Sequence, residues 1–431
     1  MKRMTGCKKL FVSITVLFVL VSLPLINSVR ASSMWSQTYG GGAIDSAEDI
    51  VQTSDGGFAI AGWTGSIDDS DFWLIKIDSF GNMEWNRTYG KKGIGGDFAN
   101  SLVETSDGGY ALAGATNSFG SGSYDFYLVR TDGAGNMLWN QTFGGSKIDQ
   151  ASAIVQTSDG GFALAGYTQS FSSEYYDFWL IKIDSFGNME WNRTYGEEGM
   201  SYASSLIKTS DGGFALGGEA FSEDGQFDFG MVKTDKDGDV EWTKTYGGEK
   251  WDRASSLVET SDGGFALAGR TNSFGSGAYD FWLVRTDANG NMQWNKTYGG
   301  SDWDEAYSLV ETSDGGFALA GETTVGAGNY DSWLVKTDGT GNMEWNQTYG
   351  GTENDRANSL VETSDGGYAL AGRTKSFGAG EYDDLWLVKT DECGIIPEFP
   401  SWAPMLLVLT VLASSIIIYK RRLLKTPIHH S

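Results

Sequence analysis

Six aspartates that recur in a repeated sequence are the side chains best placed to do chemistry in this chain. Each lies two residues before the alanine that opens an Ala/Ser-rich segment, and the fourth repeat has Ser201 instead. The six are Asp45, Asp97, Asp149, Asp252, Asp304 and Asp355. On a ring of repeats they would circle one mouth of a central channel and bind a hard cation such as Ca²⁺. The alternative is that each carboxylate accepts backbone hydrogen bonds from a nearby loop.

Catalysis by an imidazole is excluded for most of the chain. The only histidines, His429 and His430, lie at the C-terminal end. Ser-His-Asp and Cys-His nucleophiles therefore have no base before that end. Paired carboxylates could still act as acid and base, so an extracellular glycan hydrolase or lyase is the alternative function. Most aspartates, however, recur in every repeat, which favours a structural role, and we predict no catalytic residues.

The charge of the chain limits its partners. It has 31 Lys and Arg against 56 Asp and Glu, a formal net charge of −25. Such a surface repels nucleic acid and attracts cations. We therefore expect no nucleic-acid partner.

The repeat itself predicts the fold. "TSDGG" occurs seven times at intervals of 51 or 52 residues. In each repeat, segments such as "SSLVET" and "FALAG" flank this hairpin signal, and "DFWLVRTD" and "NMQWNKTY" flank a second turn. Four antiparallel strands repeated seven times predict an all-β, seven-bladed β-propeller over residues 32–394. The Ala/Ser-rich strand suits the crowded centre of the ring, and the aromatic strands suit its rim.

The two ends of this region complete each other. The last repeat stops after "DLWLVKTDECG" and lacks its fourth strand, whereas "WSQTY" at Trp35–Tyr39 has no repeat before it. We predict that Trp35–Tyr39 pairs antiparallel with residues 385–390 and closes the ring, which removes two open sheet edges.

Charged residues alternate in sign around part of the predicted ring. Repeats five, six and seven have Arg253, Glu305 and Arg356 after the aspartate position, and Arg270, Glu322 and Arg373 after "ALAG". We predict like-charged pairs within each blade and ion pairs between neighbouring blades, with Glu219 beside Arg270 as an extension.

Five of the rim strands contain an N-x-T sequon. The asparagines are Asn86, Asn140, Asn192, Asn295 and Asn346. Two interpretations remain open: glycosylation of an exported chain, or a strand ladder in which Asn and Thr share one face.

The ends of the chain indicate export and a membrane anchor. Residues 1–31 combine a basic start, an apolar run and Val29-Arg30-Ala31, as in a signal peptide. Residues 403–419 are apolar, with a length near the short limit of a transmembrane helix. The basic residues in the tail at 420–431 place that tail in the cytoplasm and everything before the helix outside.

Two families share motifs with this chain. "KTDxxGNMxW" resembles the tryptophan-docking motif of PQQ-type (quinoprotein-like) propeller repeats, which implies that a Trp of each rim strand packs between blades. These are Trp85, Trp139, Trp191, Trp242, Trp294 and Trp345. Enzymes of that family use eight blades and an adjacent Cys pair, which this chain lacks, so we expect the scaffold without the cofactor.

The tail is similar to an archaeal PEF-CTERM sorting signal. It combines Pro397-Glu398-Phe399, in a linker at 395–402, with an apolar span and Lys420-Arg421-Arg422. This resemblance implies a sorting peptidase as a partner. Nine residues follow Arg422, more than such a signal usually has.

These features favour a non-catalytic, membrane-tethered protein at the cell surface, in adhesion, envelope structure, or capture of a glycan or protein. Loops at 117–125 and 375–383 supply the Gly, Ser and aromatic residues of adaptable binding surfaces. Blade four departs most from the others, with Ser201, Gly217 and Gly230 at otherwise regular positions.

Overall fold

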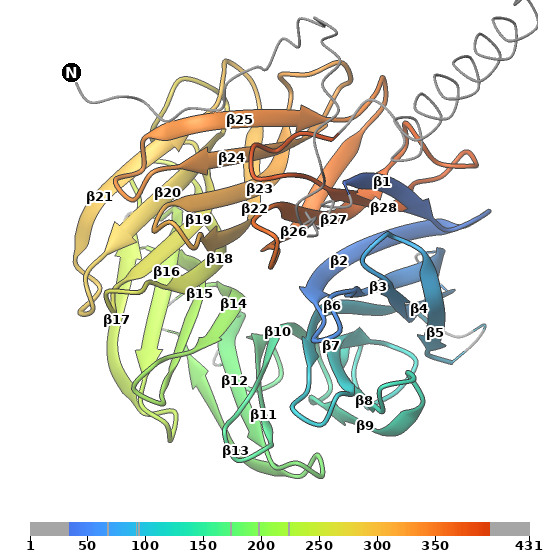
Figure 1. Ribbon diagram of the computed structural model, residues 1–431. Coiled ribbons are helices and arrows are strands. Elements are labelled where there is room, and N and C mark those ends of the chain that lie inside the picture. Colours follow the sequence, from blue (N-terminus) through green and yellow to red (C-terminus); the bar gives the residue numbers. More distant parts are fainter. Residues whose placement is uncertain are drawn as a thin grey trace, which may run out of the picture.

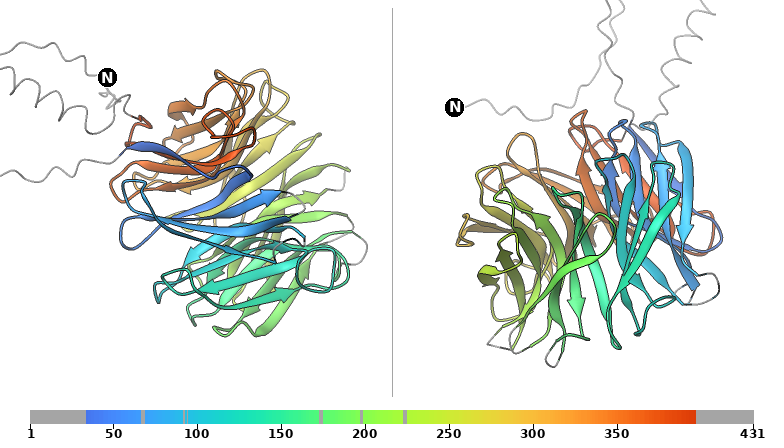
Figure 2. Two further views of the ribbon diagram at one scale, coloured as in Figure 1. Left: turned by 90° about the vertical axis from the view of Figure 1, so that its right-hand side faces the viewer. Right: turned by 90° about the horizontal axis from the view of Figure 1, so that it is seen from below.

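The computed structural model describes residues 34–66, 69–91, 93, 95–172, 175–196, 199–222 and 225–396. These residues form 28 strands in seven four-stranded antiparallel sheets, arranged as blades around a common axis (Figure 1). Seen from the side, the blades stand on edge around that axis (Figure 2). The predicted seven-bladed propeller is confirmed.

Several sequence predictions lie outside this part of the chain. They are the signal peptide at 1–31, most of the linker at 395–402, the transmembrane helix at 403–419 and the tail at 420–431. Within the residues that the structure does describe, no helix has the length and apolarity needed to cross a membrane.

Each blade runs from the axis outward in sequence order. The inner strands are β2 (Ile44–Gln52), β6 (Asp97–Glu104), β10 (Asp149–Gln156), β14 (Ser201–Lys208), β18 (Asp252–Glu259), β22 (Asp304–Glu311) and β26 (Asp355–Glu362). The second strands are β3 (Phe58–Ser66), β7 (Tyr110–Thr116), β11 (Phe162–Thr168), β15 (Phe214–Phe221), β19 (Phe265–Thr271), β23 (Phe317–Thr323) and β27 (Tyr368–Thr374).

The outer half of each blade is built from the aromatic strands. The third strands are β4 (Asp69–Ile77), β8 (Asp125–Thr131), β12 (Asp177–Ile183), β16 (Phe227–Thr234), β20 (Asp280–Thr286), β24 (Asp331–Thr337) and β28 (Asp384–Lys389). The fourth strands are β5 (Met83–Tyr89), β9 (Met137–Phe143), β13 (Met189–Tyr195), β17 (Val240–Tyr246), β21 (Met292–Tyr298), β25 (Met343–Tyr349) and β1 (Trp35–Tyr39). Blade 1 comprises β2–β5, and blade 7 comprises β26–β28 with β1.

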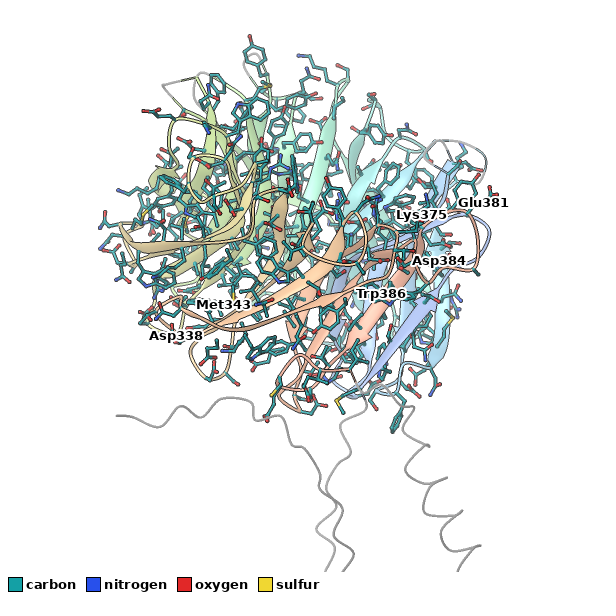
Figure 3. The ribbon with its side chains drawn as sticks, turned by 90° about the horizontal axis from the view of Figure 1, so that it is seen from above. Asp338, Met343, Lys375, Glu381, Asp384 and Trp386 are labelled. Carbon is teal, nitrogen blue, oxygen red and sulfur yellow. The ribbon has the colours of Figure 1, made fainter. Side chains whose placement is uncertain are left out.

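The N-terminal strand closes the ring as predicted. In β1, Trp35 lies opposite Lys389 and Tyr39 lies opposite Leu385 of β28. Trp386 of β28 donates its indole N–H to the Ser36 hydroxyl at 2.8 Å. Figure 3 shows Trp386 and Asp384 on this strand, below the loop that carries Lys375 and Glu381. Blade 7 is therefore assembled from both ends of the described chain.

The tryptophan of each fourth strand joins its blade to the next one. Trp35 meets Phe58 of blade 1 edge-to-face, with ring centroids 6.1 Å apart, a favourable geometry for aromatic pairs. The other six pair in the same way with the first residue of the next second strand: Trp85, Trp139, Trp191, Trp242, Trp294 and Trp345. The inter-blade position implied by the resemblance is thus confirmed.

A glycine of the following blade makes room for each indole. A Cβ on Gly81 would lie 2.9 Å from the Trp35 ring, and Gly81 also has a φ of +83°, which disfavours other residues. The Tyr39 hydroxyl donates to the carbonyl oxygen of the same glycine at 2.6 Å. The tryptophan and tyrosine of the "WSQTY" strand therefore both contact the same turn of the neighbouring blade.

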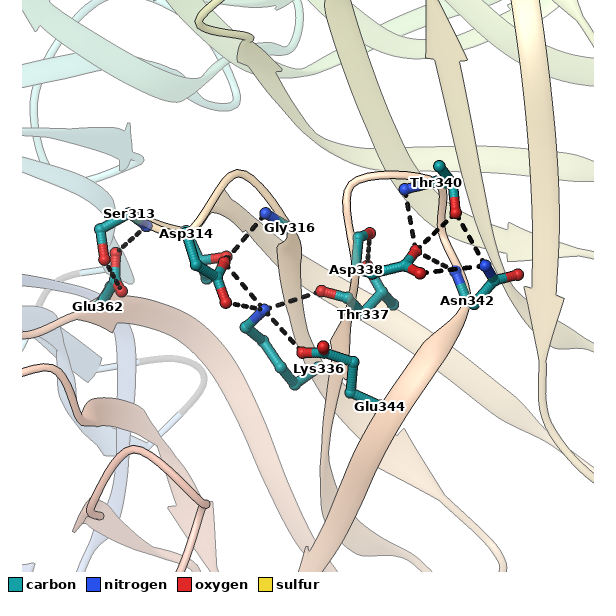
Figure 4. Close-up of polar contacts among 11 residues, drawn as sticks. Ser313, Asp314, Gly316, Lys336, Thr337, Asp338, Thr340, Asn342, Glu344 and Glu362 are labelled. Carbon is teal, nitrogen blue, oxygen red and sulfur yellow. Dashed lines mark hydrogen bonds and ion pairs between the residues drawn. The ribbon is translucent and has the colours of Figure 1, made fainter. Parts of the chain in front are cut away.

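The "TSDGG" turns form the face that we call the lower face, and they contain a buried cation that the sequence did not reveal. Lys336, whose side chain is 5% exposed, pairs with Asp314 at 2.9 Å and Glu344 at 3.3 Å (Figure 4). Burial alone would raise the pKa of Asp314, but hydrogen bonds from Thr312 and Lys336 lower it to about 2. Each blade has such a pair between the turn aspartate and a Lys or Arg of its third strand.

Two sets of hydrogen bonds join successive blades. On the lower face, the Ser313 backbone N–H and hydroxyl donate to Glu362 of the next blade, both at 2.8 Å (Figure 4). Near the axis, a side-chain oxygen of one inner strand accepts a backbone N–H of the next, as Ser308 does from Leu360 at 3.1 Å. Between blades 3 and 4 the corresponding positions are Lys208 and Ala153, which have no acceptor oxygen in their side chains.

We expect Trp35→Ala to destabilise the full chain by about 3–5 kcal/mol, because it opens a cavity in the closing seam. Denaturant unfolding followed by tryptophan fluorescence measures this change. Gln37→Ala, at an exposed position of the same strand, is the control and should change stability by less than about 0.5 kcal/mol. Equal effects of the two substitutions would contradict the role of the Trp35 seam.

Candidate functional site

The upper face, opposite the "TSDGG" turns, carries side chains that differ between blades. It carries the first residues of the inner strands and the loops between second and third strands. Each inner strand has a one-residue register shift, a β-bulge that frees one residue from pairing with the second strand. The residues at these bulges are Glu48, Asn100, Ser152, Ser204, Ser255, Tyr307 and Asn358. Bulges often re-aim side chains at functional sites, and these seven vary where the surrounding strands repeat.

The charged residues of blades 4 to 7 form a cluster on this face. The like-charged pairs are directly opposite in register: Arg253 with Arg270, Glu305 with Glu322, and Arg356 with Arg373. Arg270 Nη1 lies 2.6 Å from Glu305 Oε2, which confirms the ion pair predicted between blades 5 and 6.

Two other charge contacts differ from the sequence prediction. Glu219 pairs with Arg253 at 3.3 Å rather than with Arg270, and Arg373 pairs with Asp383 at 3.5 Å. The Arg356 guanidinium lies 4.0 Å from the centre of the Tyr307 ring. Tyr307 occupies a bulge, and regular strand pairing therefore does not predict the contact of its ring with Arg356.

Glu322 links this tyrosine to the charged cluster. The Tyr307 hydroxyl donates to Glu322 Oε1 at 2.9 Å. Burial raises the pKa of Glu322, and Arg356 and the Tyr307 hydrogen bond partly oppose that rise. A tyrosine, a carboxylate and an arginine therefore lie together on blades 6 and 7. Blades 4 and 5 bring together the same residue types, with Tyr202 opposite Glu219 in register and Glu219 paired with Arg253.

Aromatic side chains continue the upper face over blades 3 to 5. Tyr167, Tyr176 and Tyr202 lie within 5.0–5.4 Å of one another, measured between ring centroids. Phe227 extends the cluster to Trp251 at 5.9 Å, and Trp251 is 52% exposed. Exposed aromatic rings among polar side chains are typical of surfaces that bind sugars or proteins.

The six predicted aspartates lie at the upper ends of the inner strands, buried in the seams between blades. Asp149 accepts hydrogen bonds from the Ser170 hydroxyl at 2.6 Å, the Gly145 N–H at 2.8 Å and the Thr168 hydroxyl. Asp45, Asp97, Asp252, Asp304 and Asp355 occupy equivalent positions. Burial raises the pKa of Asp45, Asp97 and Asp304. Among the described residues, no three His, Cys, Asp or Glu side chains gather closely enough to hold a metal ion.

The sequon asparagines lie in the fourth strands and are exposed. They are Asn86, Asn140, Asn192, Asn295 and Asn346. The Asn192 side-chain oxygen accepts the indole N–H of Trp179 at 3.3 Å, and its amide nitrogen lies 3.3 Å from the Met189 sulfur. Similar contacts recur at Asn86, Asn295 and Asn346. Glycosylation of these positions stays a prediction.

Asp49 is a functional candidate that the repeat pattern concealed. It replaces the serine that most blades use near the axis, and accepts hydrogen bonds from Leu102 N at 2.8 Å and the Ser359 hydroxyl at 2.9 Å. Its carboxylate therefore joins blades 1, 2 and 7. Desolvation raises the pKa of Asp49 to about 6. An alignment of the seven repeats with one another would have identified this position.

Comparison with known proteins supports the fold. The chain matches no protein-family model. It is similar to the regulatory protein FlaEY of Caulobacter vibrioides, with 28% identity over 193 residues, which span 38% of this chain and 20% of that protein. Among solved structures, it resembles the WD40 domain of Neurospora crassa Pan2, with a TM-score of 0.51 and 12% identity over 85% of this chain and 98% of that domain. Sqt1 from Chaetomium thermophilum has a TM-score of 0.48 at 13% identity, over 81% and 87% of the two chains.

The chain is therefore a seven-bladed propeller of WD40-like fold. Neither the quinoprotein family nor the sorting-signal family that the sequence resembles is identified by these comparisons.

We expect Asp49→Ser to stabilise the protein at pH 7 by about 1–2 kcal/mol. The folded carboxyl has a pKa of about 6, above the ordinary value of 3.8. The folded state therefore holds this proton more tightly, and the protein loses stability as pH rises from about 4 to 6. Serine keeps an acceptor for Leu102 without this loss. Urea unfolding between pH 4 and 7 tests this, and parallel pH profiles of the two proteins would contradict it.

We expect Glu305→Ala to destabilise the protein by about 3 kcal/mol, because it leaves Arg270 partly buried without its counter-charge. The Glu305 side chain is 3% exposed. The double variant Arg270→Met/Glu305→Met should recover much of the loss in urea unfolding. Asp237→Asn, which removes an exposed pair with Lys236, is the control and should change little. A double variant less stable than Glu305→Ala would contradict the pairing.

Proposed function

We propose that this chain is an exported, membrane-tethered, non-catalytic propeller whose upper face captures a glycan or protein at the cell surface. One observation carries the proposal: charged and aromatic side chains that differ between blades contact one another on the upper face, whereas the rim tryptophans and turn ion pairs that hold the ring together repeat in every blade. Recognition needs an irregular surface, because a ligand without sevenfold symmetry cannot match seven equal blades.

The chemistry of the upper face supports binding. Trp251, Tyr175 and Tyr382 are each 52% exposed, and aromatic groups of this kind commonly supply the strongest contacts of a binding surface. Arginine and glutamate side chains on the same face offer directional hydrogen bonds. The signal-like start and the apolar, basic end of the sequence support export and membrane attachment, with a sorting peptidase as a further partner. Exposure of the sequon asparagines supports their glycosylation.

A second candidate function is a carboxylate-based glycan hydrolase or lyase. The specific observation that favours it is the group of Tyr307, Glu322 and Arg356, in which Tyr307 donates a hydrogen bond to Glu322 and burial raises the pKa of Glu322. A carboxyl group with a raised pKa can act as a general acid. Incubation with oligosaccharides followed by mass spectrometry tests this candidate, and turnover that is lost in Glu322→Gln while binding remains would favour it.

We expect Trp251→Ala to weaken ligand binding at least about tenfold, because the exposed indole is a contact on the upper face. A glycan array and a panel of envelope proteins identify the ligand, and calorimetry measures its affinity. Phe186→Ala is a matched control, since Phe186 is 76% exposed but lies in a lower-face turn. The proposal fails if Phe186→Ala weakens binding and Trp251→Ala does not.

A further inference from the structure

A second aspartate accompanies the buried aspartate in the upper-face seams. It comes from the start of the third strand of the preceding blade, and a glycine separates the two carboxylates. A Cβ on Gly144 would lie 1.9 Å from Asp125 Oδ1 and 2.9 Å from Asp149 Oδ2. The same arrangement occurs for Asp71 with Asp97, Asp280 with Asp304, Asp331 with Asp355, and Asp384 with Asp45.

The two carboxylates of a pair are not equally satisfied. Asp149 accepts hydrogen bonds at both oxygens. Asp125 Oδ2 accepts the backbone N–H groups of Ser121 at 2.7 Å and Gly122 at 3.2 Å, whereas its buried Oδ1 has no hydrogen-bond partner. Asp125 is 1% exposed, so bulk water does not solvate this oxygen.

The same orphaned oxygen recurs in other seams. Oδ1 of Asp331 and Oδ1 of Asp384 are buried without partners, and both residues are at least nine-tenths buried. In each case the other oxygen is held by loop N–H groups, at 2.6 Å from Ala327 and 2.6 Å from Ala379. Because an unpaired carboxylate oxygen recurs in several seams, it is a general feature of the seam and does not depend on the conformation of one loop.

An orphaned carboxylate oxygen beside a second carboxylate needs a positive charge. Burying an unpaired charge is costly, and a neighbouring like charge adds to that cost. The ion pairs found among the described residues involve other acids, not Asp125, Asp331 or Asp384. No lysine or arginine in the described part of the chain therefore neutralises these three pairs by direct contact.

Further hard oxygen atoms lie next to the orphaned one. A Cβ on Gly122 would lie 2.4 Å from the Lys147 carbonyl oxygen, 2.6 Å from that of Gly145 and 3.4 Å from Asp125 Oδ1. Gly277 faces the equivalent carbonyls of Asp302 and Gly300. Two carboxylates with adjacent backbone carbonyls form the all-oxygen ligand set that Ca²⁺ prefers, with water completing its coordination.

We propose that these paired aspartates bind Ca²⁺ in the seams of the upper face, each ion joining the third strand of one blade to the inner strand of the next. The site uses two acids and backbone carbonyls. It lies inside the seam and is independent of the ligand-binding surface proposed above.

The chain contains its own control for this site. Between blades 3 and 4, Asp177 has the position of Asp125, but Ser201 stands where the other seams have the second aspartate. This seam therefore offers one carboxylate instead of two, and it should not hold a calcium ion at the concentrations that fill the others.

The test uses the full chain, first freed of metal with a chelator. Calorimetry with CaCl₂ should show about one ion per aspartate pair, and CaCl₂ should raise Tm by several degrees more than NaCl of equal ionic strength. The triple variant Asp125→Asn/Asp331→Asn/Asp384→Asn should bind about half as many ions. Asp177→Asn, in the Ser201 seam, should leave the number of bound ions unchanged.

A variant that gains binding tests the proposal even if the triple variant fails to fold. Ser201→Asp completes the missing pair and should add about one calcium ion per chain. The proposal is overturned if the number of bound ions is the same in the triple variant, because calcium then binds elsewhere on the acidic surface. It is also overturned if NaCl stabilises as well as CaCl₂, or if only acidification stabilises the protein, because the pairs then share a proton.

Discussion

No blade of this propeller has a hydrophobic core of its own. Each apolar cluster is made by two or more blades, as in the one that joins Phe126 and Leu128 of blade 2 to Phe162 and Trp179 of blade 3. At every seam a rim tryptophan contacts a glycine and the aromatic residue that opens the second strand of the next blade. A sheet that buries both faces against neighbours is stable only when the last neighbour meets the first. The short β1–β28 pairing completes the blade at this last seam, so the closed ring depends on it.

The residues that hold the ring together differ from the residues that make its surface irregular. The buried lysine or arginine with its turn aspartate, the tryptophan on glycine and the hydrogen bonds between blades recur around the ring. The upper face near the axis instead carries residues such as Tyr307, Arg356 and Trp251, which most blades lack at the corresponding positions. Changes there alter few of the contacts that close the ring, so the surface is free to vary while the fold is kept. This arrangement is common in folds that present function on loops and strand ends.

Much of this architecture follows from the sequence because the repeat restates it seven times. Strand order, the hairpin turns and the closure by Trp35–Tyr39 all come from local pattern and from the incomplete last repeat. The contact of Lys336 with Asp314 did not, because "TSDGG" is explained equally well as a turn and the lysine lies 22 residues further on. The stacking of Arg356 on Tyr307 depends on a bulge, which no alternation of residues predicts. The sequence predicts aspartates at a channel mouth because sequence position gives the height of a residue along a strand. Whether its side chain enters a seam is set by the twist of the blades.

One joint of the ring differs from the others, and the difference bears on its mechanics. Between blades 3 and 4, Ala153 and Lys208 stand where other joints have a side-chain oxygen for the neighbouring blade. The ring can be regarded as seven stiff bodies connected by springs, and this spring has fewer bonds. In a closed ring of this kind, the joint with the fewest bonds undergoes the largest displacement, whether heat or a force applied to the chain causes it. Motion of the ring should therefore be largest at the joint between blades 3 and 4, next to the aromatic cluster of Tyr167, Tyr176 and Tyr202. The remaining blades should move almost as one rigid body.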